Sequence, residues 1–430
     1  MNKGLLVFTA LVAFVFALPT LSEAKIEITG AALVSAQDVD FDSTSGAQDE
    51  DLNFNDPRVN LYVNGDVSDK ISVTAKFWAA NDWSSENQRG GRGGTGAALP
   101  GAGTNGSLGE SVEMLRAYLT VKDVLGSGFD LKVGTIDIPF GYEYGMRTNN
   151  GDDMKNDFVT NSLLDINGGD EGIALSGSFD MGQTSTPLSW EVALLNGGDV
   201  TDGNPAGAGV ANDGVAGPHQ YNKSNDDLAW AIRAEVGLQE NLTLQASWYT
   251  SDQRQDGDMD PLNIGSAFLE NNINRTAPGG TMNGNLSGLV YNNRATGGYN
   301  RDVWEFAGKY DYGQGYVLAF WGNIDADTSN GNNNREYDYF GAQGRYNFDD
   351  NSYVAVRYNQ IDPDYVNSNN LGEPSLWTIA AGYKLADNAM VKAEWSSFDE
   401  DGSALSQGTN TVDTVNGDAD ALTVSVGVSF

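Results

Sequence analysis

Apolar and polar side chains alternate one for one in a series of segments distributed along the sequence beyond residue 24. In the last such segment, Leu422, Val424, Val426 and Val428 are each separated by one small or polar residue. Successive side chains of a β-strand point to opposite faces, so each segment is predicted to be a strand with one apolar and one polar face. Together with an opening strand at about 25–37, roughly 16 strands are predicted.

The connections between these segments alternate in length. Short turns such as Ser68-Asp69-Lys70 alternate with long, polar, Gly-rich stretches. The long stretches lie near 38–56, 80–111, 136–170, 196–226, 251–301, 323–335, 360–374 and 399–419. An even number of strands joined in this way is typical of outer-membrane barrels, with short periplasmic turns and long extracellular loops. The fold class predicted is therefore all-β, a transmembrane antiparallel β-barrel of about 16 strands with its apolar faces toward lipid.

A secreted β-sandwich or β-helix is the alternative. A sandwich would not place all the long loops at one end, and a solenoid would show a fixed repeat, which the sequence lacks. Aromatic residues gather near both ends of the predicted strands, as in the two aromatic girdles of a membrane barrel. In one hairpin the alternation assigns Trp304, Phe306 and Tyr310, and then Leu318 and Phe320, to the lipid face.

The first 24 residues are predicted to be a secretory signal. Lys3 provides a positive start, an apolar run spans 5–18, and Ser22 and Ala24 place small residues at the cleavage site. A single N-terminal membrane anchor is the alternative. The predicted barrel then spans 25–430 and lies in the bacterial outer membrane, in contact with lipid and lipopolysaccharide. Beyond the signal, no apolar run approaches the roughly 20 residues of a membrane-spanning helix.

Composition excludes several kinds of chemistry. The chain has no cysteine, which excludes disulfides and thiolate chemistry. Its one histidine, His219, lies in a Gly/Pro/Asn-rich stretch, and the sequence has no G-x-S-x-G turn to supply a serine nucleophile. We therefore expect that the protein is not an enzyme. The formal charge is −35, from 24 basic and 59 acidic residues. Nucleic-acid binding is not expected, because it requires clustered Lys and Arg.

The polar faces predict a mildly basic lumen. The basic residues assigned to the pore wall are Arg58, Lys76, Arg116, Lys132, Arg233, Arg345 and Arg357. Glu191, Glu235, Glu305 and Glu394 are among the acidic residues on the same faces, and the surplus acid lies in loops such as 38–51. The loop acids either keep the outer surface solvated or attract cations such as Ca²⁺. No calcium-loop motif is present, so metal ligands remain unassigned, and no other cofactor is expected.

The stretch 136–170, the third long loop, is predicted to fold into the barrel and constrict it. Charge at the narrowest point sets what passes through a water-filled pore. The residues assigned to the constriction are Tyr142, Glu143, Tyr144, Arg147, Asp152, Asp153, Lys155 and Asp157. This acid-leaning set favours small cations and neutral solutes. The alternative is that the loop stays outside as a cap.

The runs KVGTIDIPFGYE, DEGIALSG and EVALLNG resemble the phosphate-selective porin O/P-type family of outer-membrane porins. The matching positions are Pro139, Phe140, Gly141, Gly172, Gly177, Asn196 and Gly197. The resemblance implies a 16-stranded homotrimer in which the third loop constricts each channel. The family's substrate site depends on a dense set of Arg and Lys. This loop offers only Arg147 and Lys155, so the substrate is not carried over.

The sequence thus predicts a porin for passive diffusion of small hydrophilic solutes and ions. The alternative is a surface protein in which the barrel is an anchor and the long acidic loops bind partners or cations. Deleting the loops near 80–111 and 251–301 separates the two, because only the second role depends on them.

Overall fold

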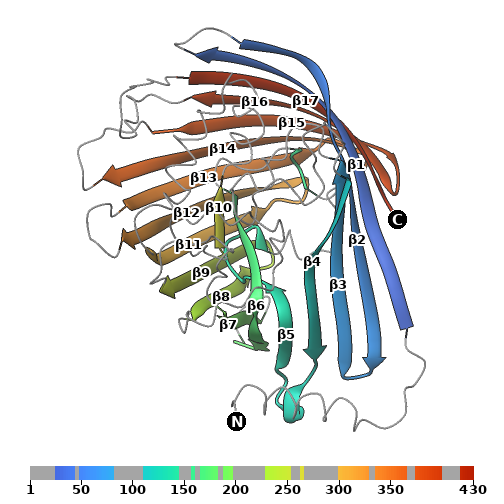
Figure 1. Ribbon diagram of the computed structural model, residues 1–430, viewed down its shortest axis with the longest axis vertical. Coiled ribbons are helices and arrows are strands. Elements are labelled where there is room, and N and C mark those ends of the chain that lie inside the picture. Colours follow the sequence, from blue (N-terminus) through green and yellow to red (C-terminus); the bar gives the residue numbers. More distant parts are fainter. Residues whose placement is uncertain are drawn as a thin grey trace, which may run out of the picture.

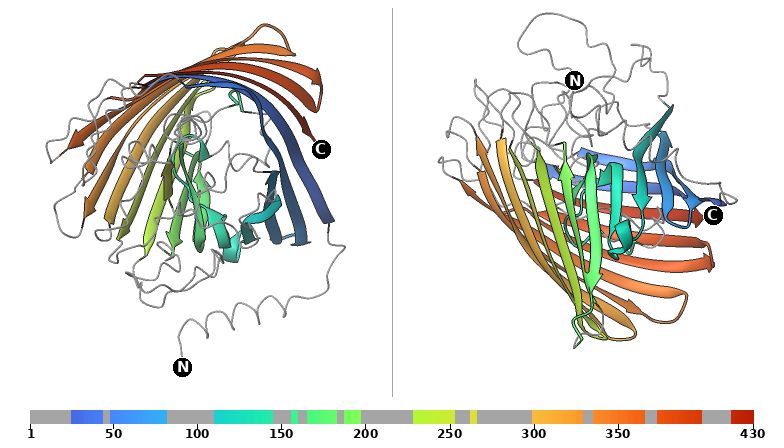
Figure 2. Two further views of the ribbon diagram at one scale, coloured as in Figure 1. Left: turned by 45° about the horizontal axis from the view of Figure 1, so that its top comes forward. Right: turned by 90° about the horizontal axis from the view of Figure 1, so that it is seen from below.

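In a computed structural model of the chain, the strands follow one another around a closed ring (Figures 1 and 2). The structure describes residues 25–43, 48–81, 110–144, 156–159, 165–182, 187–196, 228–252, 262–265, 299–328, 335–365, 373–399 and 417–430. The predicted signal, His219 and most of the long loops lie outside these residues. Among the described residues, no helix is long and apolar enough to cross a membrane.

Sixteen antiparallel strands close the barrel. They are β1 (Lys25–Ser43), β2 (Gln48–Ser68), β3 (Ile71–Asn81), β4 (Glu110–Val121), β5 (Asp130–Asp137), β6 (Asp165–Phe179), β7 (Leu188–Leu195), β8 (Ala229–Gln239), β9 (Leu242–Asp252), β11 (Tyr299–Asp311), β12 (Gly315–Thr328), β13 (Arg335–Asn347), β14 (Ser352–Tyr365), β15 (Ser375–Ala386), β16 (Ala389–Asp399) and β17 (Gly417–Ser429). Neighbours in this order pair, and β1 pairs with β17 from Ala31↔Ser429 to Ser43↔Gly417. The predicted barrel is confirmed.

Alternating burial shows which face of each strand points outward. On β15, Trp377, Ile379 and Tyr383 are exposed, whereas Thr378 and Ala380 between them are fully buried. A barrel has no edge, so its backbone groups pair internally and an apolar exterior can face lipid. The same alternation runs along β7, β8, β9, β13, β14 and β17, with the apolar set predicted for lipid on the exterior.

For β12 the sequence-based assignment of faces is wrong. Leu318 and Phe320 are 5% and 7% exposed and point into the barrel, while Val317 and Trp321 are about half exposed on the outside. Both faces of this strand carry large apolar residues, so alternation alone cannot tell them apart. Tyr249, Tyr353 and Phe398 are among the aromatic residues that the sequence places near strand ends as part of the two girdles. They are 0%, 3% and 1% exposed and face inward, so the girdle prediction is wrong for these three.

Two connections differ from the prediction. The stretch 38–56 is mostly strand, because β1 and β2 pair as far as Phe41↔Gln48. The third loop is shorter than 136–170, since β5 ends at Asp137 and β6 begins at Asp165. A short strand that was not predicted, β10 (Leu262–Gly265), pairs with the first four residues of β6.

Candidate functional site

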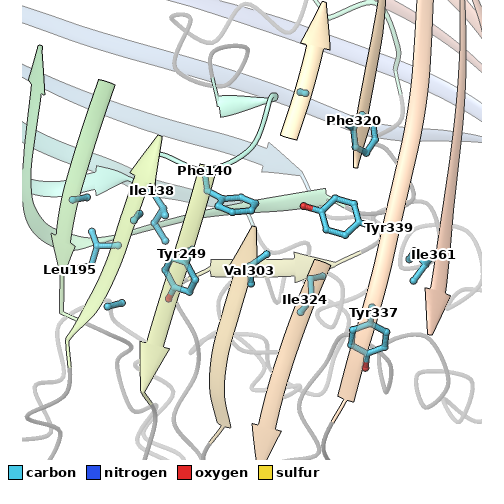
Figure 3. Close-up of a cluster of buried hydrophobic side chains, with 14 of the residues drawn as sticks. Ile138, Phe140, Leu195, Tyr249, Val303, Phe320, Ile324, Tyr337, Tyr339 and Ile361 are labelled. Atoms are coloured by element: carbon cyan, nitrogen blue, oxygen red, sulfur yellow. The ribbon is translucent and has the colours of Figure 1, made fainter. Parts of the chain in front are cut away.

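The segment after β5 packs against the inner face of the barrel wall. Ile138 and Phe140 are 3% and 2% exposed and belong to one apolar cluster with inward-facing side chains of β7 to β16 (Figure 3). Part of this cluster forms a band across five neighbouring strands, in which cross-strand pairing links Ala231, Tyr249, Val303, Ile324 and Tyr337. The interior of β8 to β13 is therefore apolar near the long loops, where the sequence predicts a polar lumen.

A first anchor lies at Gly141 and Tyr142. The Gly141 amide donates to Ser247 Oγ of β9 at 3.0 Å, and the Tyr142 amide donates to Glu305 Oε1 of β11 at 2.6 Å. The Tyr142 ring stacks on Phe320 of β12 with 4.5 Å between ring centroids. Gly141 has a φ of +77°, a conformation that glycine adopts without strain, so the chain can turn toward the buried Glu305 carboxylate.

Tyr144 joins the same segment to β7. Its hydroxyl donates to Glu191 Oε2 at 2.9 Å, and Glu191 Oε1 also accepts from Lys132 Nζ of β5 at 2.8 Å. The Arg233 guanidinium of β8 lies 5.4 Å from the centroid of the Tyr144 ring. Glu143 is half-buried, and its Oε1 accepts a hydrogen bond from the Tyr142 hydroxyl at 3.0 Å.

A second anchor holds residues 156–159, and Asp157 is its centre. The Asp157 carboxylate accepts from Arg345 Nη1 of β13 at 2.5 Å and from the Tyr316 hydroxyl of β12, and its backbone carbonyl accepts from the Tyr353 hydroxyl of β14 at 2.8 Å. The Asp157 side chain is 6% exposed. The sequence prediction assigns Asp157 to the pore surface, whereas the structure buries this carboxylate in an ion pair with the wall.

The residues around Asp157 extend this anchor to two more strands. The Val159 amide donates to Glu394 Oε2 of β16 at 2.6 Å, and Lys392 Nζ donates to the Asn156 carbonyl. Arg357 of β14 lies 4.3 Å from the centroid of the Phe158 ring, which is 7% exposed. We call residues 156–159 with their partners on β12, β13, β14 and β16 the clasp.

Most predicted pore-wall cations have an acidic partner in the structure. Arg116 pairs with Asp137 at 2.5 Å, Lys132 with Glu191 at 2.8 Å, and Arg233 with Glu235 at 2.6 Å. Arg345 and Arg357 both contact the clasp. Lys76 of β3 lies 5.3 Å from the centroid of the Tyr62 ring. Arg58 lies on β2, but its side chain is outside the described part.

The structure thus brings Tyr142, Tyr144 and Asp157 onto the inner wall. Arg147, Asp152, Asp153 and Lys155 lie outside the described residues, so their positions stay predictions. The sequence did not predict that Glu305 and Glu394 would accept hydrogen bonds from loop amides. Lys392 lies two residues from Glu394 on the same inward face, so the pattern of charges along these strands did not single out the two carboxylates.

Metal ligands remain unassigned. Among the described residues, no group of three or more His, Asp or Glu side chains could hold a metal ion. The backbone register does place Asp40 of β1 opposite Asp49 of β2 and Asp420 of β17.

No family model and no curated protein matches the sequence. Solved structures do match. The anion-selective porin from Comamonas acidovorans has a TM-score of 0.54 and 9% identity, and the match covers 95% of this chain and 100% of that chain. Outer-membrane expressed OmpT of Vibrio cholerae has a TM-score of 0.53 and 10% identity, covering 96% and 99%. The outer membrane channel DcaP of Acinetobacter baumannii has a TM-score of 0.51 and 13% identity, covering 96% and 99%.

At these identities the likeness shows a shared barrel fold. A closed antiparallel barrel with an apolar exterior is the architecture of proteins of the bacterial outer membrane, and that is the location of this chain. The specific resemblance to the phosphate-selective O/P-type family is not supported by a matching family model.

Proposed function

We propose that the chain is an outer-membrane porin through which small hydrophilic solutes and ions diffuse passively. The water path that we propose runs between the anchored residues 138–144 and 156–159 on one side and the wall formed by β1 to β5 on the other. The observation that carries this proposal is the fixation of the segment at two places: Tyr142 is held by β11 and β12, and Asp157 is held by β12, β13 and β14. A loop fixed at both ends against one wall narrows a barrel without closing it.

The charges near this path are largely compensated. Arg116, Lys132, Arg233 and Arg345 each lie within 2.8 Å of a carboxylate oxygen. A pore wall whose charges are paired in this way selects solutes by size more than by charge. This supports passage of small neutral solutes and small ions, with the remaining acids of the third loop favouring cations. Such diffusion requires no catalytic group, and we propose none.

Recordings from the purified full chain in planar bilayers test the function. We expect stable ionic current and a reversal potential close to zero in a salt gradient, displaced slightly toward cations. Absence of current from protein that migrates as a folded barrel would refute the porin. A strong anion preference would instead support the phosphate-selective family that the sequence resembles.

Two further properties belong to this proposal. One structural neighbour, OmpT of Vibrio cholerae, is described in a trimer form, with 11% identity and a TM-score of 0.51. Together with the resemblance noted above, this supports a homotrimer. The register of acidic residues on β1, β2 and β17 supports weak Ca²⁺ binding. Ca²⁺ should then raise the unfolding temperature, and an excess of chelator should reverse the effect.

A further inference from the structure

The clasp joins the loop to the wall through two adjacent side chains of different chemistry. Asp157 presents a carboxylate, and Phe158 presents an aromatic ring. The Asp157 side chain is 6% exposed and Phe158 is 7% exposed, so both are buried. A carboxylate and a ring that enter the wall side by side have the chemical groups of a small aromatic carboxylate.

Two donors of the wall converge on the Asp157 carboxylate. Arg345 Nη1 donates to Oδ1 at 2.5 Å, and the Tyr316 hydroxyl donates to Oδ2. Other wall residues hold both donors in place, because Arg345 Nε donates to Asn347 Oδ1 at 2.7 Å and the Tyr316 hydroxyl accepts from Gln343 Nε2 at 2.8 Å. A guanidinium and a hydroxyl that are oriented by the wall can receive a carboxylate from another molecule as well as from the loop.

The wall also provides an apolar surface for the ring. Phe158 packs in a cluster of its own with Tyr353, Ala355, Ala380 and Met390, separate from the larger apolar cluster of the barrel interior. Ala355 of β14 and Ala380 of β15 pair across the two strands and are 1% and 0% exposed. Two facing alanines leave room above the sheet for a flat ring, which larger side chains at these positions would fill.

The charges of the wall around the clasp favour an anion. Among the described wall residues in contact with the clasp, Arg345, Arg357 and Lys392 are basic and Glu394 is acidic. The Arg357 guanidinium lies 4.3 Å from the centroid of the aromatic ring of the clasp. Three cations therefore face one carboxylate of the wall, and Asp157 supplies a second. When Asp157 leaves, the excess positive charge attracts another anion to the same place.

We propose that this part of the wall is a binding site for small aromatic carboxylates, which Asp157 and Phe158 occupy when no such ligand is present. The ligand carboxylate binds Arg345 and Tyr316, and its ring takes the place of the Phe158 ring. Ligand and clasp compete, so binding releases residues 156–159 from the wall. The proposal rests on the porin function put forward above, to which it adds a class of solute that the channel recognises.

Competition with the clasp predicts that two variants of one ion pair differ in ligand affinity. The apparent affinity is the intrinsic affinity multiplied by the fraction of molecules in which the clasp is open. Asp157→Asn weakens the clasp and keeps the wall intact, so it should bind benzoate about 30- to 150-fold more tightly than the wild type does. Arg345→Gln also weakens the clasp but removes the ligand's own partner. It should bind benzoate at least about tenfold more weakly than Asp157→Asn does.

Titration calorimetry of the full chain in mild detergent measures these affinities, and the shift in gel mobility on heating confirms that each variant is a folded barrel. Acetate lacks the ring and benzyl alcohol lacks the charge, so each should bind Asp157→Asn at least about tenfold more weakly than benzoate. Lys70→Gln is the matched control, because it removes one positive charge from an exposed turn. Its benzoate affinity should equal that of the wild type.

A single thiol reports the release of the clasp, since the chain contains no cysteine. In Val159→Cys, benzoate should accelerate labelling by a maleimide until the site is saturated, whereas benzyl alcohol at the same concentrations should not. This measurement uses an otherwise unchanged wall, so it does not depend on how the other variants fold.

Several results would overturn the proposal. They are equal benzoate affinities of Asp157→Asn and the wild type, equal affinities of Asp157→Asn and Arg345→Gln, acetate binding as tight as benzoate binding, or labelling that benzoate leaves unchanged. The outcome is separate from that of the bilayer recordings. Ionic current without a benzoate response would keep the porin and remove this site, and a benzoate response without current would refute the porin and leave the site standing.

Discussion

Neutralising Asp157 should loosen the third loop. In Asp157→Asn the side chain keeps its shape and one oxygen acceptor but loses its charge. Arg345, whose side chain is 25% exposed, then has no anionic partner at the 2.5 Å contact. The Tyr316 hydroxyl can still donate to the amide oxygen. The change therefore removes one charged interaction from the clasp and leaves most of its packing intact.

The magnitude follows from the burial of this pair. Removing one partner of a fully buried ion pair costs about 3–5 kcal/mol, and a hydrogen bond to a charged group contributes about 1.5–3 kcal/mol. Water reaches part of Arg345, so the free energy that holds the clasp closed should fall by about 2–3 kcal/mol. Because each 1.4 kcal/mol is a factor of ten, the population with the clasp open should rise by about 30- to 150-fold.

Thiol labelling measures this opening directly. Val159→Cys introduces the single thiol of the chain at the last residue of the clasp and preserves the backbone amide that donates to Glu394. Labelling by a maleimide should be about 30- to 150-fold faster when Asp157→Asn is added. In bilayer recordings the same variant should show more frequent brief closures. Asp123→Asn is the control, because its partner Lys70 lies in an exposed turn.

A double-mutant cycle with Arg345→Gln shows whether the pair is responsible. The combined variant should label much more slowly than the product of the two single effects predicts, with a coupling of about 1.5–3 kcal/mol. Labelling within twofold of the Val159→Cys parent in Asp157→Asn, or strict additivity in the cycle, would refute the clasp.

Three further outcomes are expected. Phe320→Ala removes the ring stacked on Tyr142 and should raise the single-channel conductance. It should also lower the free energy of unfolding of the barrel in urea by about 3–5 kcal/mol. A conductance equal to that of the wild type would exclude a role for this stack in setting the pore width. Glu191→Gln leaves Lys132 uncompensated and should move the reversal potential toward anions, whereas Asp123→Asn should not. In the turn after β13, hydrogen bonds from the Asn351 amide and from Ser352 lower the pKa of Asp349. The charged form of Asp349 therefore stabilises the fold above about pH 4, and this stabilisation is lost as the pH falls through the lowered pKa. Asp349→Ala should reduce the urea midpoint of unfolding at pH 7, and the difference between this variant and the wild type should shrink below about pH 4.

Periodicity predicted the barrel because the alternation is a local property of each strand. The lipid faces of β15 and β17 follow directly from residues such as Ile379 and Val424, whose neighbours are small or polar. The face of β12 could not be predicted, since Phe320 and Trp321 are both large, aromatic and adjacent. Which of them faces lipid depends on what fills the interior, and that is set by Tyr142, a residue far away in sequence.

The site was predictable as a stretch and not as a set of contacts. Composition indicated that Asp157 was one of several loop acids, and nothing local distinguished it from Asp152 or Asp153. Its role depends on Arg345, which is 188 residues away along the chain. The partners Glu305 and Glu394 were recognisable as lumen residues from their strand faces. That they accept backbone amides of the loop could be known only from the folded chain.

The two anchors of the third loop attach to strands between β9 and β16. That part of the wall therefore gains a second packed layer from within, and burial of apolar surface between the two layers stabilises it.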